Sequence, residues 1–304
     1  MRTHYPKIRI QANDSYLLAR EGLKITFYMQ HSHKYVIRGV EQSLETYLRA
    51  VGSQALGWYI DDEGEAQELN ALGWDITRRT LREGPSHIIR LHDAELLDYR
   101  YRFEYHGKDF QDASVQQEPN AVCEASFWLP TEFLEAHGPS SLRTLALELA
   151  SPLPLCSGHA GLSFNGRLSH IGVSDTIAQY CFRYPGIDFP KATGYSWSVG
   201  TRIRGPHWMT FIGQPVLGAL GGAQGLRSRL QTPGVSVAEI TGDRAVVTLG
   251  EWPEAGDSEQ GQELPAYREL ARVLEPWLYF EPRSRMSDFS PEETRRWDRR
   301  FLDP

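Results

Sequence analysis

The stretch SGHAGLSFNG occupies residues 157–166, in the middle of the 304-residue chain, and its interpretation decides the fold. A nucleophile elbow would need Gly-x-Ser-x-Gly on a turn from strand to helix. Gly161 and Ser163 match this motif, but Asn165 occupies the position of its second glycine. A phosphate-binding loop would end in Gly-Lys-Ser or Gly-Lys-Thr, and this ending is absent. The pattern therefore favours a glycine-rich turn that leads into a buried strand.

Hydrophobic periodicity on either side of this stretch predicts an α+β fold with a mainly antiparallel sheet and packed helices. Aromatic residues alternate with polar ones over residues 99–106, which is the period of a strand with one buried face. Because no regular alternation of strands and helices is present, this arrangement is favoured over a doubly wound parallel sheet. The other predicted strands are residues 23–29, 87–93, 122–130, 235–241 and 245–250, and the predicted helices are residues 42–55, 131–137, 140–150, 174–184, 265–278 and 291–302.

Two features of the sequence bear on domain organisation. The two C-terminal helices end the chain, and the second begins with Ser290, Pro291 and Glu293, the pattern of a capping box. Two prolines within residues 151–157 mark a possible subdomain boundary. We expect a single α+β domain over residues 1–304, with that boundary as its one candidate division.

Aromatic residues after the middle of the chain predict part of the core. The sequence SWSVGTRIRGPHWMTF, residues 196–211, is interpreted as two paired strands joined by a turn at residues 204–207. We therefore expect the side chains of Trp197, Trp208 and Phe211 to be largely buried.

Composition excludes several classes of function. The formal net charge of -7 argues against nucleic-acid binding, which needs a basic face. No run of about 18 apolar residues is present, so no membrane span is expected, and the N-terminus lacks a secretory pattern. Cys123, Cys156 and Cys181 have no metal-binding spacing. These features predict a cytoplasmic protein with reduced, buried thiols.

The sequence His-Ser-His at residues 31–33 offers a catalytic alternative. Two histidines at positions i and i+2 on a strand end point to the same side, as in the metal sites of some hydrolases. A solvated turn after a strand explains His31 and His33 equally well, and the strand–helix alternation of a barrel is missing. The metal-dependent hydrolase therefore stays an alternative, with further ligands to be sought among His87, His92, Asp93, His170 and His207.

Two acidic segments are candidates for a binding surface. Residues 61–68, DDEGEAQE, and residues 251–263, EWPEAGDSEQGQE, each hold five carboxylates and no basic residue. Such runs are usually solvated loops, but they could also dock on a basic protein surface. The residues expected to contact such a partner are Asp61, Asp62, Glu63, Glu65, Glu254, Asp257 and Glu259.

An ordered set of motifs runs through the second half of the chain. It comprises LCSGHAGLSFNG, FRYPGIDFP, SWSVGTRIRGPHWMTFIGQPVLGALGG, PAYRELARVLEP and FSPEETRRWDRRF. In order and spacing, these motifs resemble a bacterial family of type VI secretion immunity proteins, formerly described as a domain of unknown function. The resemblance covers residues 152–301 clearly and the first half in outline.

The resemblance implies a protein that neutralises a toxin effector by stoichiometric binding. It implies no catalytic residue, cofactor or metal site, and it makes residues 157–166 a scaffold element. A chain without an export signal would meet its toxin in the cytosol, so the expected partner is a cognate effector with a nuclease domain, and an NAD-consuming toxin is the second choice. An adaptor that loads an effector without inhibiting it is a further alternative.

Overall fold

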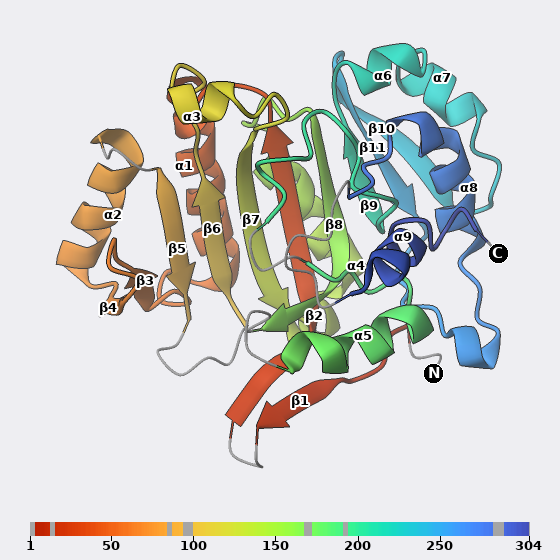
Figure 1. The fold of residues 1–304 in the computed structure, drawn as a ribbon, viewed down its shortest axis with the longest axis horizontal. Helices are drawn as coiled ribbons and strands as arrows, with labels where there is room; N and C mark the ends of the chain where they lie inside the picture. The colour runs from red at the N-terminus through yellow and green to blue at the C-terminus, as the bar shows by residue number, and fades with distance from the viewer. Residues whose placement is uncertain are drawn as a thin grey trace.

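A long antiparallel sheet organises the computed structural model, which describes residues 4–12, 16–83, 87–93, 100–166, 172–190, 194–281 and 289–303. Within these residues the sheet has eleven strands in the order β10-β11-β9-β8-β2-β7-β6-β5-β3-β4, and β1 pairs with β2 outside this path (Figure 1). The predicted α+β class and the mainly antiparallel sheet are therefore confirmed.

The strands and helices are distributed along the whole described chain. The strands are β1 (Arg9–Ala12), β2 (Tyr16–Met29), β3 (Trp58–Ile60), β4 (Ala66–Glu68), β5 (Ile88–His92), β6 (Arg102–His106), β7 (Cys123–Pro130), β8 (Ser157–Gly166), β9 (Met209–Ile212), β10 (Val235–Thr241) and β11 (Arg244–Leu249). The helices are α1 (His33–Val51), α2 (Ala71–Glu83), α3 (Ala113–Gln116), α4 (Thr131–Ala150), α5 (Val173–Arg183), α6 (Val216–Ala219), α7 (Gly222–Ser228), α8 (Pro265–Leu274) and α9 (Pro291–Asp298).

One face of the sheet packs against α1 and α4, which lie behind it in Figure 1. Aromatic side chains fill this layer: the Phe127 ring lies 5.3 Å from the Tyr47 ring of α1 and 5.2 Å from the Phe103 ring, and Phe27 lies 5.2 Å from Phe211, between ring centroids. These side chains are fully buried. Such edge-to-face and tilted aromatic pairs add to the stabilisation from burial.

Strand β8 consists of residues 157–166, the stretch predicted to enter the core. It pairs with β2 along its whole length and with β9 on its other side, and every residue in it is buried. A Cβ atom on Gly158 would lie 2.7 Å from the Thr26 carbonyl oxygen, and one on Gly166 would lie 2.4 Å from that of Leu18. Small residues are therefore required for the two strands to approach each other, and Ser163 sits inside a strand rather than on a catalytic turn.

Two elements begin well before their predicted starts. Helix α1 begins at His33, nine residues before the predicted start at residue 42. Strand β2 begins at Tyr16 rather than at residue 23. The two helices predicted at 131–137 and 140–150 are confirmed, because α4 consists of two helical segments that meet at a kink at Gly138, where φ is 75°.

The prediction for residues 196–211 is right for the core and wrong for the strands. Trp208 and Phe211 are buried, but the Trp197 side chain is 46% exposed. Only residues 209–212 form a strand, and Trp197 lies in a turn held by the bond from the Val122 backbone N–H to the Ser196 carbonyl. The Lys108 ammonium lies 4.1 Å from the Trp197 ring centroid, so a cation–π contact covers one side of this half-exposed ring.

The C-terminal part follows the sequence pattern closely. Helices α8 and α9 confirm the two predicted C-terminal helices, and the capping box at Ser290 and Glu293 has both of its hydrogen bonds.

The three cysteines, Cys123, Cys156 and Cys181, are buried and form no disulfide bond. None of the helices in the described ranges is long and apolar enough to span a membrane. The division into domains stays a prediction.

Exposure separates two tryptophans that the sequence does not distinguish. We expect Trp208→Ala to lower the free energy of unfolding by about 3–5 kcal/mol, because it leaves a large cavity in the core. Trp197→Ala, the matched control, should cost less than about 1 kcal/mol, since its ring already contacts water. Urea unfolding of both variants measures this, and equal costs would contradict the assigned burial.

Candidate functional site

The histidine pair is not arranged as a metal site. His33 is the first residue of α1 and is buried, whereas His31 lies in the exposed bend after β2. His33 Nδ1 lies 2.9 Å from the Tyr105 hydroxyl and Nε2 lies 2.8 Å from the Leu81 carbonyl oxygen. Burial and the nearby His87 ring lower the pKa of His33 to about 4. Both nitrogens of this ring are engaged, so the same-side pair expected for a strand end does not form.

The first acidic segment forms the turn between β3 and β4. The Asp61 carboxylate accepts hydrogen bonds from Gln67 Nε2 and from the backbone N–H of Glu65, both at 2.8 Å, and these bonds lower the pKa of Asp61. Asp61 therefore shapes the turn. Asp62, Glu63 and Glu65 are exposed on it.

A groove of about 210 Å³ lies beside this turn, at the junction of α2 with β3 and β5. Its lining combines the carboxylates of Asp62 and Glu63 with the aliphatic side chains of Ile60, Ile76 and Ile88. A lysine or arginine of another protein fits this combination, because its stem packs on apolar surface while its charge meets a carboxylate.

The second acidic segment is engaged within the molecule. Arg183 of α5 donates to both carboxylate oxygens of the buried Asp257, at 3.1 and 3.0 Å, and also lies 2.6 Å from Glu259. The carboxylate of Glu254 lies 2.8 Å from His4 Nδ1. The hydrogen bonds from Arg183 lower the pKa of Asp257. The two predicted acidic segments are thus not brought together: one lies at the β3–β4 edge of the sheet, and the other packs on α5.

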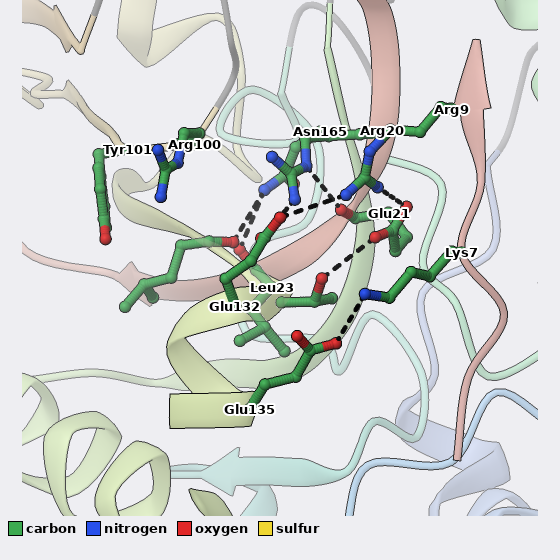
Figure 2. A network of polar contacts seen from close by, with 12 residues as sticks. Lys7, Arg9, Arg20, Glu21, Leu23, Arg100, Tyr101, Glu132, Glu135 and Asn165 are labelled. Carbon is green, nitrogen blue, oxygen red and sulfur yellow. Dashed lines mark hydrogen bonds and ion pairs between the residues drawn. The ribbon is translucent and has the colours of Figure 1, made fainter. Parts of the chain in front are cut away.

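A second charged network ties β1 and β2 to the start of α4, and Figure 2 shows its side chains. The fully buried Glu21 carboxylate accepts from the Ile8 backbone N–H at 2.9 Å, from the Thr131 hydroxyl at 3.1 Å and from Arg9. Glu132 accepts from both Arg9 and Arg20. Each charge in this network has a partner of opposite sign, so the network is structural.

Sequence reasoning missed a buried cluster under the segment that follows α5. Arg204 donates two hydrogen bonds to the Asp188 carboxylate, at 2.8 and 2.7 Å, and His207 Nε2 lies 3.6 Å from the same group. The His159 ring of β8 stacks on His207, with 4.1 Å between ring centroids. Burial would raise the pKa of Asp188, but the Arg204 guanidinium holds it well below its usual range. The one signal in the sequence is a lone carboxylate between apolar residues in PGIDFP.

The same cluster contains a potential set of metal ligands. His159, Asp188 and His207 each offer a ligand atom, and these atoms lie within 4.8 Å of one another. Burial lowers the pKa of both histidines, which favours the neutral rings that bind metal ions. However, both oxygens of Asp188 already accept from Arg204, and that cation neutralises the carboxylate. The arrangement is therefore best explained as a structural polar contact that holds Asp188, Arg204 and His207 together beside His159 of β8.

Comparison with known proteins places the chain in a family. It matches the family model described as type VI immunity for VRR-NUC over residues 39–301. No curated protein matches the sequence. The solved structure of the Pseudomonas aeruginosa T6SS protein PA0821 has a TM-score of 0.80 to this chain, with 18% identity, and the match covers 98% of this chain and 88% of that chain. At this identity the likeness shows a shared fold.

The family match extends over most of the chain, and it defines the protein as a type VI immunity protein. The family to which it belongs is TsiV, described as type VI immunity for VRR-NUC. The resemblance predicted from the motifs of residues 152–301 is therefore confirmed, and the match reaches well into the first half.

The Asp188–Arg204 pair should make stability depend on acid. Asp188→Asn leaves the Arg204 charge buried without its carboxylate, so we expect a loss of about 3–5 kcal/mol in the free energy of unfolding at neutral pH. Because the folded-state pKa of Asp188 is depressed, its contribution is present above about pH 4 and is lost as the pH falls further.

Urea unfolding from neutral pH to about pH 3 measures this, with Glu118→Gln as the control because Glu118 is exposed. The variant Asp188→Asn should show a flatter acid dependence than the wild type and the control. Equal stability of all three proteins at neutral pH would mean that the pair does not stabilise the fold.

Proposed function

We propose that this protein binds the nuclease domain of a cognate VRR-NUC effector and neutralises it by stoichiometric occlusion in the cytoplasm, without chemistry of its own. The observation that carries this proposal is the family match over residues 39–301. A nuclease finds its substrate in the cytoplasm, so an antidote acting there would meet it before damage occurs. Inhibition by occupancy needs tight binding, on the order of nanomolar or about -12 kcal/mol.

The exposed turn between β3 and β4 is the best candidate for the first contact with the effector. A nuclease binds nucleic acid through lysine and arginine side chains, so its substrate groove is basic. Asp62, Glu63 and Glu65 offer exposed carboxylates to such a groove, and Asp61 sets the turn that displays them. The neighbouring apolar groove supports a contact that combines charge with burial.

The second acidic segment is a weaker candidate. Asp257 and Glu259 are paired with Arg183, and Glu254 is paired with His4, so an approaching basic residue would have to compete with these internal partners. We therefore assign recognition to the first segment and anchoring of the loop to Asp257.

Charge reversal tests the role of the first acidic turn. We expect the triple variant Asp62→Lys, Glu63→Lys and Glu65→Lys to associate with the effector nuclease domain at least about tenfold more slowly at low salt, because electrostatic steering is lost. The difference should shrink at high salt, where screening weakens the attraction. Stopped-flow measurements over a salt series supply the rates.

The matched control reverses Glu45, Glu118 and Glu292, which are exposed elsewhere and change the net charge equally. An equal slowing of the control would assign the effect to overall charge and remove the turn from the interface.

Growth of cells that express the effector separates neutralisation from the adaptor alternative, because an adaptor binds without rescuing growth. Failure of the wild-type chain to bind or protect would overturn the proposed function.

A further inference from the structure

The sheet face opposite α1 and α4 carries buried polar atoms that lack partners. Nine buried side-chain nitrogen and oxygen atoms of the described residues have no hydrogen-bond partner. Seven of the nine belong to this face or to the cluster on it, on Thr26, Arg102, Trp128, His159, Asn165 and His207. Native proteins leave few such atoms unsatisfied, so their concentration on one face calls for a missing partner.

Three of the side chains on this face form one row across neighbouring strands. In the antiparallel register, Lys24 of β2 lies opposite Trp128 of β7, and Trp128 lies opposite Arg102 of β6. The Lys24 ammonium is 5.9 Å from the Trp128 ring centroid, and the Arg102 guanidinium carbon is 4.8 Å from it. Neighbouring strands are about 4.8 Å apart, so Lys24 and Arg102 flank Trp128 from strands roughly 9.6 Å apart, and an acceptor bound at the indole N–H would lie between the two cations.

The row is buried, yet three of its donor groups, one on each side chain, have no acceptor among the described residues. Lys24 is 7% exposed and Trp128 is 3% exposed. Within the described residues the Lys24 ammonium has neither a hydrogen bond nor an ion pair, and Arg102 Nε and Trp128 Nε1 are unpartnered as well. An ammonium, a guanidinium N–H and an indole N–H can only donate. What the row lacks is therefore an acceptor.

The two cations in the row favour a negative acceptor. Glu104 accepts from Arg102 Nη2 at 2.6 Å and compensates that guanidinium. Within the described residues Lys24 forms no such pair: the buried Glu124 of β7 lies on the same face, but it accepts from the Tyr195 backbone N–H and forms no ion pair with Lys24. A buried cation without an ion pair is costly. Burial accordingly lowers the pKa of Lys24, although Glu124 and Glu104 act in the opposite direction.

The row can be reached from the side of β5 and β6. The Arg102 side chain is 25% exposed, and two large apolar side chains, those of Ile88 in β5 and Trp197, are also exposed. In Figure 1, α1 lies behind β6 and α2 lies beside β5 at the left edge of the sheet. Arg90 lies opposite Glu104 in the register and adds a further cation on this side.

We propose that Lys24, Trp128 and Arg102 form a binding site for a single carboxylate or similar oxyanion. The anion accepts from the Lys24 ammonium, from Arg102 Nε and from Trp128 Nε1, and its negative charge pairs with the buried ammonium. Two sources share this chemistry: a free small anion, or an acidic side chain of the bound effector. Only the second source rests on the proposed function.

Nuclear magnetic resonance of the full chain tests the site directly. The probe is sodium acetate, titrated against sodium chloride at equal ionic strength, and the readout is the indole N–H signal of Trp128, assigned by its loss in Trp128→Phe. We expect a saturable shift of this signal in the wild type and none in Lys24→Met, which keeps the side-chain length but removes the charge. Lys7→Met, at an exposed lysine, is the control and should behave as the wild type.

The second arm measures the affinity of the same variants for the effector nuclease domain. A loss of about tenfold or more in Lys24→Met, with Lys7→Met unchanged, identifies the anion as an acidic group of the effector. A shift by acetate without an effect on effector affinity identifies a free anion. If acetate does not shift the wild-type signal, and a Lys24→Met variant that is folded by its thermal unfolding binds the effector as tightly as the wild type, the anion site is overturned. If the wild-type chain itself does not bind the effector, the proposed function fails, and the acetate titration still decides the site.

Discussion

The close approach of β8 to β2 is the constraint on which the rest of the structure depends. Gly158 and Gly166 leave room for the backbone of β2, and any side chain there would enter it. Because the two strands pair along the whole of β8, the sheet continues without a break from β10 to β4. The helices α1 and α4 then cover one face, and the polar residues of β2, β7 and β8 are placed together on the other.

The charges of the molecule separate into those that are satisfied internally and those that are not. Asp188 with Arg204, Glu21 with Arg9, and Asp257 with Arg183 join segments that are distant in sequence, and they leave little for a partner. The exposed carboxylates of Asp62, Glu63 and Glu65 and the buried ammonium of Lys24 are different, since they form no ion pair within the described residues. Net charge alone would have hidden this contrast, because the chain is acidic overall and basic along one row of its sheet.

Local sequence patterns predicted the elements well and the pairing of charges poorly. The alternation of aromatic residues located β6, and the stretch 157–166 coincides with β8. The site required knowledge of distant neighbours: nothing in the acidic run at 251–263 indicates that Arg183 holds Asp257, and nothing in His-Ser-His indicates that Leu81 and Tyr105 engage His33. Trp197 was misjudged for the same reason, because its exposure depends on a turn against Val122.

The pairing of β2 with β8 also has a consequence for timing. Tyr28 pairs with Ser157, and β9 and β11 extend the same sheet from still later in the chain, so the core closes only through contacts between distant residues. Chains dominated by such non-local pairings fold slowly, because loop closure comes before the stabilising contacts. A nascent chain also exposes the edge of β2 that pairs with β8 until β8 has been synthesised. Protection against an effector that arrives suddenly must therefore come from molecules folded beforehand, and the cell's defence is set by its standing stock rather than by fresh synthesis.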